Sequence, residues 1–123
     1  MRGAPVNTLK RVALFAGLSR REIQMVARLF KPRRFAAGAT VIKEGSGGAA
    51  FFIIESGEAD VAIRGKKRST LKADDCFGEI ALIDDGPRMA TITAATDLVC
   101  YGLTYWDFRP VVKANGTIGW KLL

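Results

Sequence analysis

The sequence predicts a mainly β domain, a sandwich or barrel flanked by short helical segments. Between residues 33 and 103 the chain consists of short β-rich pieces at spacings of about 8–12 residues, broken repeatedly by glycine. No helical crossover pattern lies between these pieces, which argues against a parallel sheet. Helical spacing of apolar residues is confined to the two ends. At 123 residues the chain fits a single domain, 1–123, with one core.

The first of two expected N-terminal helices runs over 5–17. It starts at Pro5, and Leu9, Val12 and either Phe15 or Ala16 recur at helical spacing. Gly17, a residue type that commonly ends helices, closes it.

The second expected helix starts with a capping box formed by Ser19 and Glu22. Leu18 before the cap and Ile23 after it are spaced to pack on each other as a hydrophobic staple. Pro32 is expected to close this helix. The helical pair therefore covers residues 5–31.

The β region, 33–103, contains six segments with strand character. They cover residues 40–43, 50–55, 59–63, 69–72, 89–94 and 98–103. The Ser56–Gly57 turn predicts a hairpin that joins the second and third of these segments. The polar run 64–68 is expected to be a solvated turn, with contact to a phosphate as the less favoured alternative.

The C-terminal segment, 104–123, is expected to be helical. Thr104 and Asp107 are candidate caps, and Pro110 predicts a kink or a late helix start because it lacks the N–H that a helix interior needs. Asn115 and Gly116 are expected to break the chain. A further helix over 118–123 would be truncated by the end of the sequence.

Composition weighs against catalysis. The chain has no histidine, which removes the commonest acid–base group and the ligands of a β-barrel metalloenzyme. Cys76 and Cys100, on apparent strands, are too few for a zinc or iron–sulfur site. Neither a membrane-spanning apolar run nor a signal peptide is recognisable, so a cytoplasmic location is expected. The chain is therefore not expected to be an enzyme.

The net charge of +7 is unevenly distributed, because residues 1–49 hold ten of the nineteen Lys and Arg residues against two acids. Such a surface could attract nucleic acid or a membrane face, although a solvated positive face is the simpler interpretation. No aromatic residues alternate with the basic ones as base stacking would require. Direct DNA binding is therefore not expected.

The segment 77–91 carries the strongest functional signal. Gly78 and Glu79 open a short apolar run that is suited to one or two helical turns, and a helix start is an anion site. Arg88, farther along, can hold a phosphate through two parallel hydrogen bonds. Glu79 would repel the phosphate, so a ribose hydroxyl is its natural partner. The alternative is a surface ion pair between Glu79 and Arg88 beside an ordinary helix.

This segment resembles the phosphate-binding cassette of the cyclic-nucleotide-binding domain family, which reads Phe-Gly-Glu-aliphatic-Ala-Leu, a loop, then Pro-Arg-x-Ala-Thr. The resemblance implies an eight-stranded β-roll, a jelly-roll-like double-stranded β-helix with flanking helices. It assigns Glu79 to the ribose 2′-hydroxyl, Arg88 to the cyclic phosphate, and the backbone amides of Gly78, Ala81 and Met89 to the phosphate cradle. The ligand-binding residues expected from it are Gly78, Glu79, Ile80, Ala81, Arg88, Met89 and Ala90.

The resemblance also implies a regulatory module without a prosthetic group, which passes a cyclic-nucleotide signal to an effector domain or partner protein. Cyclic AMP is favoured over cyclic GMP because Met89 stands where cyclic-GMP-selective members often carry threonine. A homodimer is compatible with this interpretation. The alternative is a degenerate member of the family, acting as a structural, interaction or transcription-regulator domain without nucleotide binding.

Overall fold

A computed structural model describes residues 4–12, 15–45, 50–78, 90–114 and 116. The described part of the chain is mainly β, as predicted. Its helices are α1 (Val6–Lys10), α2 (Arg20–Ala27) and α3 (Tyr105–Ala114). Its strands are β1 (Lys31–Phe35), β2 (Thr40–Ile42), β3 (Ala50–Ser56), β4 (Ala59–Ile63), β5 (Lys66–Leu71), β6 (Cys76–Phe77), β7 (Thr91–Ala94) and β8 (Leu98–Thr104).

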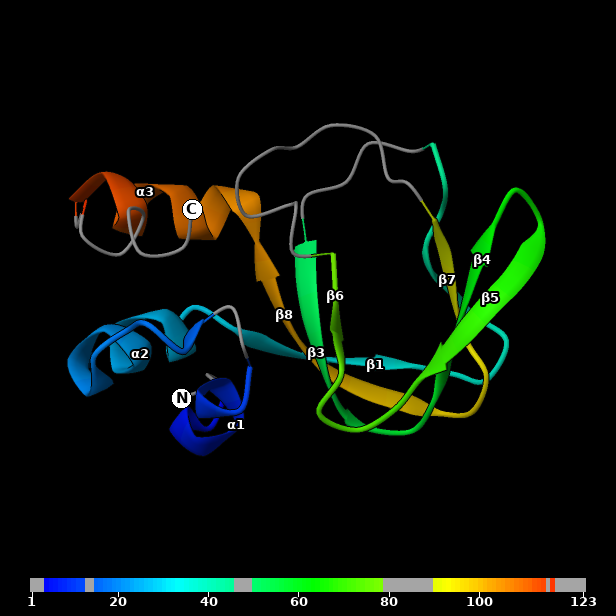
Figure 1. Ribbon diagram of the computed structural model, residues 1–123, viewed down its shortest axis with the longest axis horizontal. Coiled ribbons are helices and arrows are strands. Elements are labelled where there is room, and N and C mark those ends of the chain that lie inside the picture. The colour runs from blue at the N-terminus through cyan, green and yellow to red at the C-terminus, as the bar shows by residue number, and fades with distance from the viewer. Residues whose placement is uncertain (1–3, 13–14, 46–49, 79–89, 115, 117–123) are drawn as a thin grey trace.

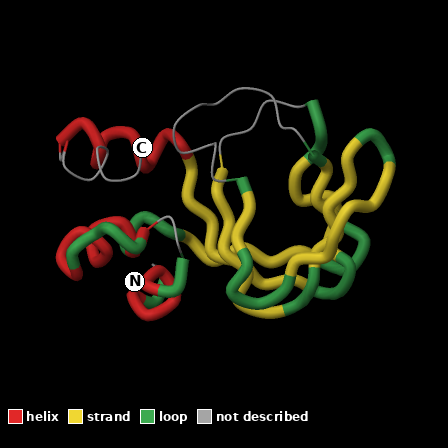
Figure 2. Tube along the Cα trace, viewed as in Figure 1, coloured by secondary structure: helices red, strands yellow, loops and turns green. Residues whose placement is uncertain are grey.

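The eight strands form two four-stranded antiparallel sheets. Sheet A has the order β1-β8-β3-β6 and sheet B the order β2-β7-β4-β5. The helices gather beside sheet A, whereas the β4–β5 hairpin lies at the opposite end of the molecule (Figure 1). The strands curve into an open roll, which is clearest in the tube view (Figure 2). The β-roll expected from the cassette is thus confirmed.

The predicted hairpin between β3 and β4 is wrong, because the two strands belong to different sheets. Gly57, with φ of +92°, carries the chain from sheet A to sheet B. A side chain at this position would overlap the backbone carbonyl oxygen of Asp97. The positive φ and the close approach of the two chain segments both require glycine.

β4 instead forms its hairpin with β5, and only Arg64 and Gly65 make the turn. The predicted solvated turn over 64–68 is therefore too long, since β5 begins at Lys66. Strand pairing extends this far because Lys66 pairs with Ile63 and Lys67 with Ala62. Exposed lysine is compatible with an edge strand such as β5.

The α-helix expected over 5–17 ends much earlier than predicted. Beyond α1 the N–H groups of Val12, Phe15 and Leu18 each donate to the carbonyl oxygen three residues back, at 3.0 Å. Leu9, Val12, Phe15 and Leu18 are all buried. An apolar residue at every third position suits consecutive turns of this tighter kind, which the sequence pattern did not separate from an α-helix.

The predicted capping box is confirmed. The Ser19 hydroxyl accepts a hydrogen bond from the Glu22 N–H at 3.2 Å, and the Glu22 carboxylate accepts one from the Ser19 N–H at 2.8 Å. Leu18 and Ile23, the proposed staple, are buried in the same core.

Pro32 does not close α2, which ends at Ala27; it lies within β1 opposite Tyr101. The helical pair therefore does not reach residue 31. β1 is at the edge of sheet A, where a missing N–H is tolerated. The sequence Lys-Pro-Arg-Arg gave little sign of this strand.

The hydroxyl of Thr104 accepts a hydrogen bond from the Asp107 N–H at 3.0 Å, which confirms Thr104 as a cap. α3 begins at Tyr105 and contains Pro110, so the late start is wrong. The carbonyl that Pro110 cannot bond is that of Trp106, whose side chain is largely exposed to solvent. The helix expected over 118–123 lies outside the described residues.

Sheet A separates two hydrophobic cores. The outer core lies between sheet A and the helices and contains Phe15, Phe30 and Phe51. The inner core lies between the two sheets and contains residues of both, including Phe52 from β3 and Ile92 from β7. We call the face of each sheet that is turned toward the other sheet its inner face.

Candidate functional site

The ends of the cassette lie in different sheets. Gly78 directly follows β6 of sheet A, and Ala90 directly precedes β7 of sheet B. Both are partly buried. Five of the expected site residues, Glu79, Ile80, Ala81, Arg88 and Met89, lie outside the described residues. The described geometry therefore concerns the two supports of the cassette.

The support on sheet A is held against β3 by three contacts. The Phe77 ring stacks on Phe52 of β3, with ring centroids 5.2 Å apart. The N–H of Ile54 donates to the carbonyl of Asp75, and the Asp74 N–H donates to the carbonyl of Ile54, both at 2.9 Å. Gly78 then takes φ of +80°, a backbone conformation that favours glycine. The cassette therefore begins at a residue whose backbone conformation other residue types rarely adopt.

The support on sheet B is the start of β7. Thr91 pairs with Ala62, and its hydroxyl accepts a hydrogen bond from the N–H of Glu44 at 3.0 Å. A carboxylate oxygen of Glu44 accepts from the N–H of Arg64 at 2.9 Å. These bonds link β7, the segment just after β2 and the β4–β5 turn. Ala90 is therefore joined to a strand that is bonded to two other segments.

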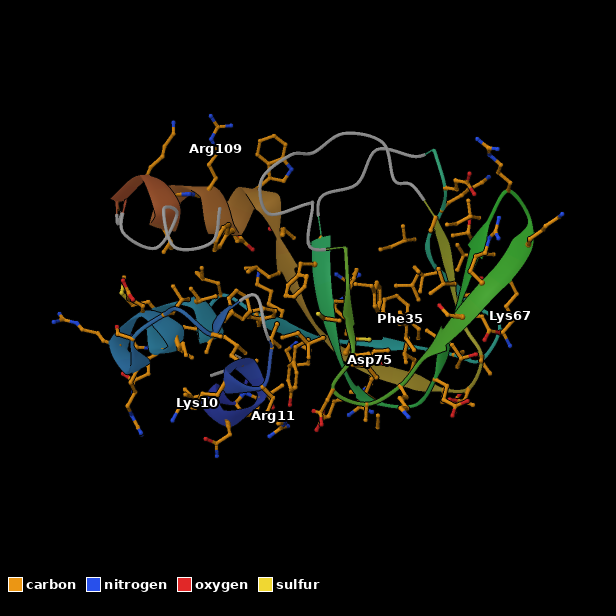
Figure 3. The ribbon with its side chains drawn as sticks, viewed as in Figure 1. Lys10, Arg11, Phe35, Lys67, Asp75 and Arg109 are labelled. Carbon is orange, nitrogen blue, oxygen red and sulfur yellow. The ribbon has the colours of Figure 1, made fainter. Side chains whose placement is uncertain are left out.

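The inner face of sheet A carries a row of residues at the level of the cassette. Lys31 pairs with Gly102, Gly102 with Phe52, and Phe52 with Phe77. The four residues therefore lie in one row across β1, β8, β3 and β6. Side chains directly opposite each other share a face. Phe35, farther along β1, also packs on the inner core, and Figure 3 shows it between the two sheets.

Basic residues occupy three inner-face positions that the sequence analysis did not single out. Arg33 pairs with the buried Cys100, and its guanidinium carbon lies 5.9 Å from the centre of the Phe35 ring. Lys66 pairs with Ile63 at the start of β5. Lys31 lies 3.8 Å from a carboxylate oxygen of Asp107. The sequence carried no clear signal for them, because Arg33 and Arg34 are alike and which of the two faces the interior depends on the register of β1 with β8.

The described carboxylates lie elsewhere. None of the inner-face strand positions that the structure describes is Asp or Glu. Asp60 is on the outer face of β4, where it contacts Lys67 at 3.3 Å and accepts a hydrogen bond from Thr70 at 3.1 Å. Asp74 lies 2.9 Å from Arg11, on the helix side of sheet A. The described part of the roll interior is therefore positive.

The cysteines offer little chemistry. Cys100 is fully buried, and desolvation raises the pKa of its thiol from 9.0 to about 12. The pKa of Tyr101 is raised by burial and by its hydrogen bond to Glu55.

Among the residues described, no three His, Cys, Asp or Glu residues are grouped to hold a metal ion. Within the same ranges, no helix is long and apolar enough to span a membrane.

A small antiparallel roll with a positive inner face, in which the two ends of the cassette sequence, Gly78 and Ala90, adjoin different sheets, is the arrangement of a binding module for a small anion. The model of the cyclic nucleotide-binding domain matches residues 32–115. The chain belongs to this family.

Two curated relatives and one solved structure are informative. The cAMP-dependent protein kinase regulatory subunit of Candida albicans is 35% identical over 95% of this chain and 25% of its own length. The cGMP-dependent protein kinase of Plasmodium berghei is 35% identical over 87% of this chain and 13% of its own. The structure of cAMP-bound PfPKA-R matches with a TM-score of 0.77 and 30% identity, over 89% of this chain and 39% of that one. The chain thus spans a quarter or less of these two curated relatives.

Proposed function

We propose that this chain, acting as one domain over 1–123, binds a cyclic mononucleotide through the cassette between β6 and β7. The observation that carries the proposal is that the cassette sequence begins at Gly78 on one sheet and ends at Ala90 on the other. A ligand held by this segment would face the inner surface of the roll. The proposed contacts are Gly78, Glu79, Ile80, Ala81, Arg88, Met89 and Ala90.

Each polar residue has a distinct proposed role. The Arg88 guanidinium binds the cyclic phosphate through paired charge-assisted hydrogen bonds. The Glu79 carboxylate accepts a hydrogen bond from the ribose 2′-hydroxyl. The backbone N–H groups of Gly78, Ala81 and Met89 complete the phosphate cradle, as N–H groups at a helix start commonly do.

Cyclic AMP is the proposed ligand, with cyclic GMP as the alternative. The relatives support a cyclic nucleotide but include both kinds of kinase. The choice depends on Met89, whose thioether is only a weak acceptor and donates nothing to the extra polar groups of guanine. A buried polar group without a partner costs about 1–3 kcal/mol, which corresponds to roughly a five- to hundredfold preference for cyclic AMP.

The binding module is proposed to regulate rather than catalyse. It would pass the ligand signal to an effector domain or a partner protein, as a free chain or as part of a longer one, in the cytoplasm. A homodimer is compatible with this role. No direct contact with DNA is required for it.

The first test is a thermal-shift panel with cyclic AMP, cyclic GMP, AMP and no ligand. A ligand that binds only the folded state raises the melting midpoint by mass action. We expect cyclic AMP to raise it most and AMP least. If neither cyclic nucleotide moves the midpoint at millimolar concentration, the degenerate-domain alternative is correct. Equal affinities in calorimetry would contradict the preference for cyclic AMP alone.

The second test is Arg88→Ala. Hydrogen bonds to charged groups contribute about 1.5–3 kcal/mol, so the variant should bind cyclic AMP roughly ten- to over a hundredfold more weakly. Arg21→Ala is a charge-matched control, because Arg21 is exposed on α2 away from the cassette supports. Calorimetry that finds the same affinity for both variants would contradict the role of Arg88.

A further inference from the structure

Three cations on the inner face of the roll remain unexplained by the cassette. We call Lys31, Arg33 and Lys66 the cationic rim. We propose that the cationic rim speeds the capture of the anionic ligand. This inference rests on the proposed function, because it concerns how the same ligand reaches the same interior.

The first argument is register on sheet A. The row Lys31, Gly102, Phe52 and Phe77 ends next to Gly78, where the cassette begins. A Cβ at Gly102 would lie 3.0 Å from the Phe52 ring and 3.4 Å from Cγ of Arg33. The stem of Arg33 therefore lies against Gly102, which is two strand spacings, or roughly 10 Å, from Phe77.

Register on sheet B repeats the arrangement. Thr91 pairs with Ala62, so Ala90, one residue before Thr91, is level with Ile63, one residue after Ala62. Ile63 pairs with Lys66. Lys66 is therefore also two strand spacings, roughly 10 Å, from the cassette end at Ala90. Both ends of the cassette thus share a level with a cation on the inner face.

The second argument is charge. Lys31 is close to Asp107, but no ion pair joins Arg33 or Lys66 to a carboxylate among the described residues. Both are exposed to solvent. The inner-face strand positions that the structure describes contain no Asp or Glu to cancel them. A concave surface of one sign concentrates counter-ions and raises the association rate of a charged ligand.

The third argument is the contrast between neighbours. Arg34 and Lys67 follow Arg33 and Lys66 in the sequence, but on the opposite face of their strands: Arg34 pairs with Val99 and Lys67 with Ala62. Each neighbour has the same charge as its rim counterpart and lies at the same sheet edge. The chain therefore contains its own control for total charge.

The test compares two double variants, Arg33→Gln with Lys66→Gln and Arg34→Gln with Lys67→Gln. Each lowers the net charge by two. Association and dissociation rates of cyclic AMP are measured by stopped-flow competition with a fluorescent analogue, at about 20 mM and 500 mM salt. One unit charge about 10 Å away and a second about 14 Å away in water predict roughly a threefold slower association for the inner double variant at low salt. The outer double variant should associate at close to the wild-type rate.

Two readouts separate charge from packing. The difference should disappear at high salt, where screening acts within a few ångströms. A charge-retaining double variant, Arg33→Lys with Lys66→Arg, should restore the association rate. Equal slowing by the inner and outer variants, or a loss that persists at high salt and in the charge-retaining variant, would overturn the inference. Failure of the wild-type chain to bind either cyclic nucleotide would instead contradict the proposed function, and the inference with it.

Discussion

The two cores on either side of sheet A differ in how deeply their phenylalanine rings are buried. In the outer core Phe15, Phe30 and Phe51 are fully buried and pack edge to face, with centroids 5.9–6.4 Å apart. Both cores have partly buried apolar residues at their margins, but the inner margin includes a phenylalanine ring, Phe35, which lies beside the guanidinium of Arg33. The helices cover one side of sheet A, and sheet B faces the other side (Figure 1).

The difference separates stability from binding. A sealed aromatic cluster gains its full burial energy and has no surface left for a ligand. A partly exposed apolar margin with nearby cations is less favourable for the folded chain alone, but it can gain from a ligand that has both an apolar and an anionic part. The inner core is thus the side of the sheet where binding can alter stability.

Truncation in each core tests this comparison most strongly. Phe51→Ala should lower the free energy of unfolding by about 3–5 kcal/mol, the usual cost of removing a buried ring. Phe35→Ala should cost less than about 2 kcal/mol, because part of that ring is already in contact with water. Urea denaturation measures both. Similar losses would mean that the inner core is as closed as the outer one.

Substitution of Gly57, which connects the two sheets, should give the next largest loss of stability. Gly57→Ala combines a positive φ with overlap against the carbonyl of Asp97, so we expect a loss of about 2–4 kcal/mol. Gly38→Ala has a similar φ of +89° but open space around it, and should cost about 1 kcal/mol. If the two variants have the same melting midpoint, the close approach of the two chain segments at Gly57 does not constrain the fold.

The smallest expected effect is the pH dependence of stability that comes from Cys100. Because the folded pKa of Cys100 is raised from 9.0 to about 12, the unfolded chain releases its proton first, and stability should fall as pH rises through this range. At pH 10 this loss of stability is about 1.4 kcal/mol in the wild type and should vanish in Cys100→Ala. A thiol reagent should label the partly buried Cys76 well before Cys100. If the stability of Cys100→Ala falls with alkaline pH as steeply as that of the wild type, the loss of stability does not come from the Cys100 thiol.

Local patterns predicted the type of many elements, but often not their bounds and not their partners. The strand over 59–63 and the Ser19 cap follow from alternation and capping chemistry, which depend on neighbouring residues. The β3–β4 hairpin failed because pairing across two sheets is decided by distant segments. β1 was missed because the edge strand around Pro32 is largely exposed and lacks an apolar alternation.

The candidate site shows the same division. The cassette could be recognised because its residues are contiguous. The cationic rim could not, since Arg33 and Lys66 come together only through the register of β1 with β8 and of β4 with β5. A strand face can be predicted from alternation, but which strands turn that face toward a common interior depends on topology.

The strand order also has a consequence for synthesis. Among the described strands β1 pairs only with β8, and Lys31 pairs with Gly102, which is separated from it by more than half of the chain. Contacts between such distant segments carry a large loop-closure entropy and slow folding. On the ribosome, sheet A cannot be completed until β8 has emerged, long after Gly78 has left the exit tunnel. Until then β3, which holds the cassette support β6, lacks its second neighbour, and a nascent chain interrupted before residue 98 should be unable to retain the ligand.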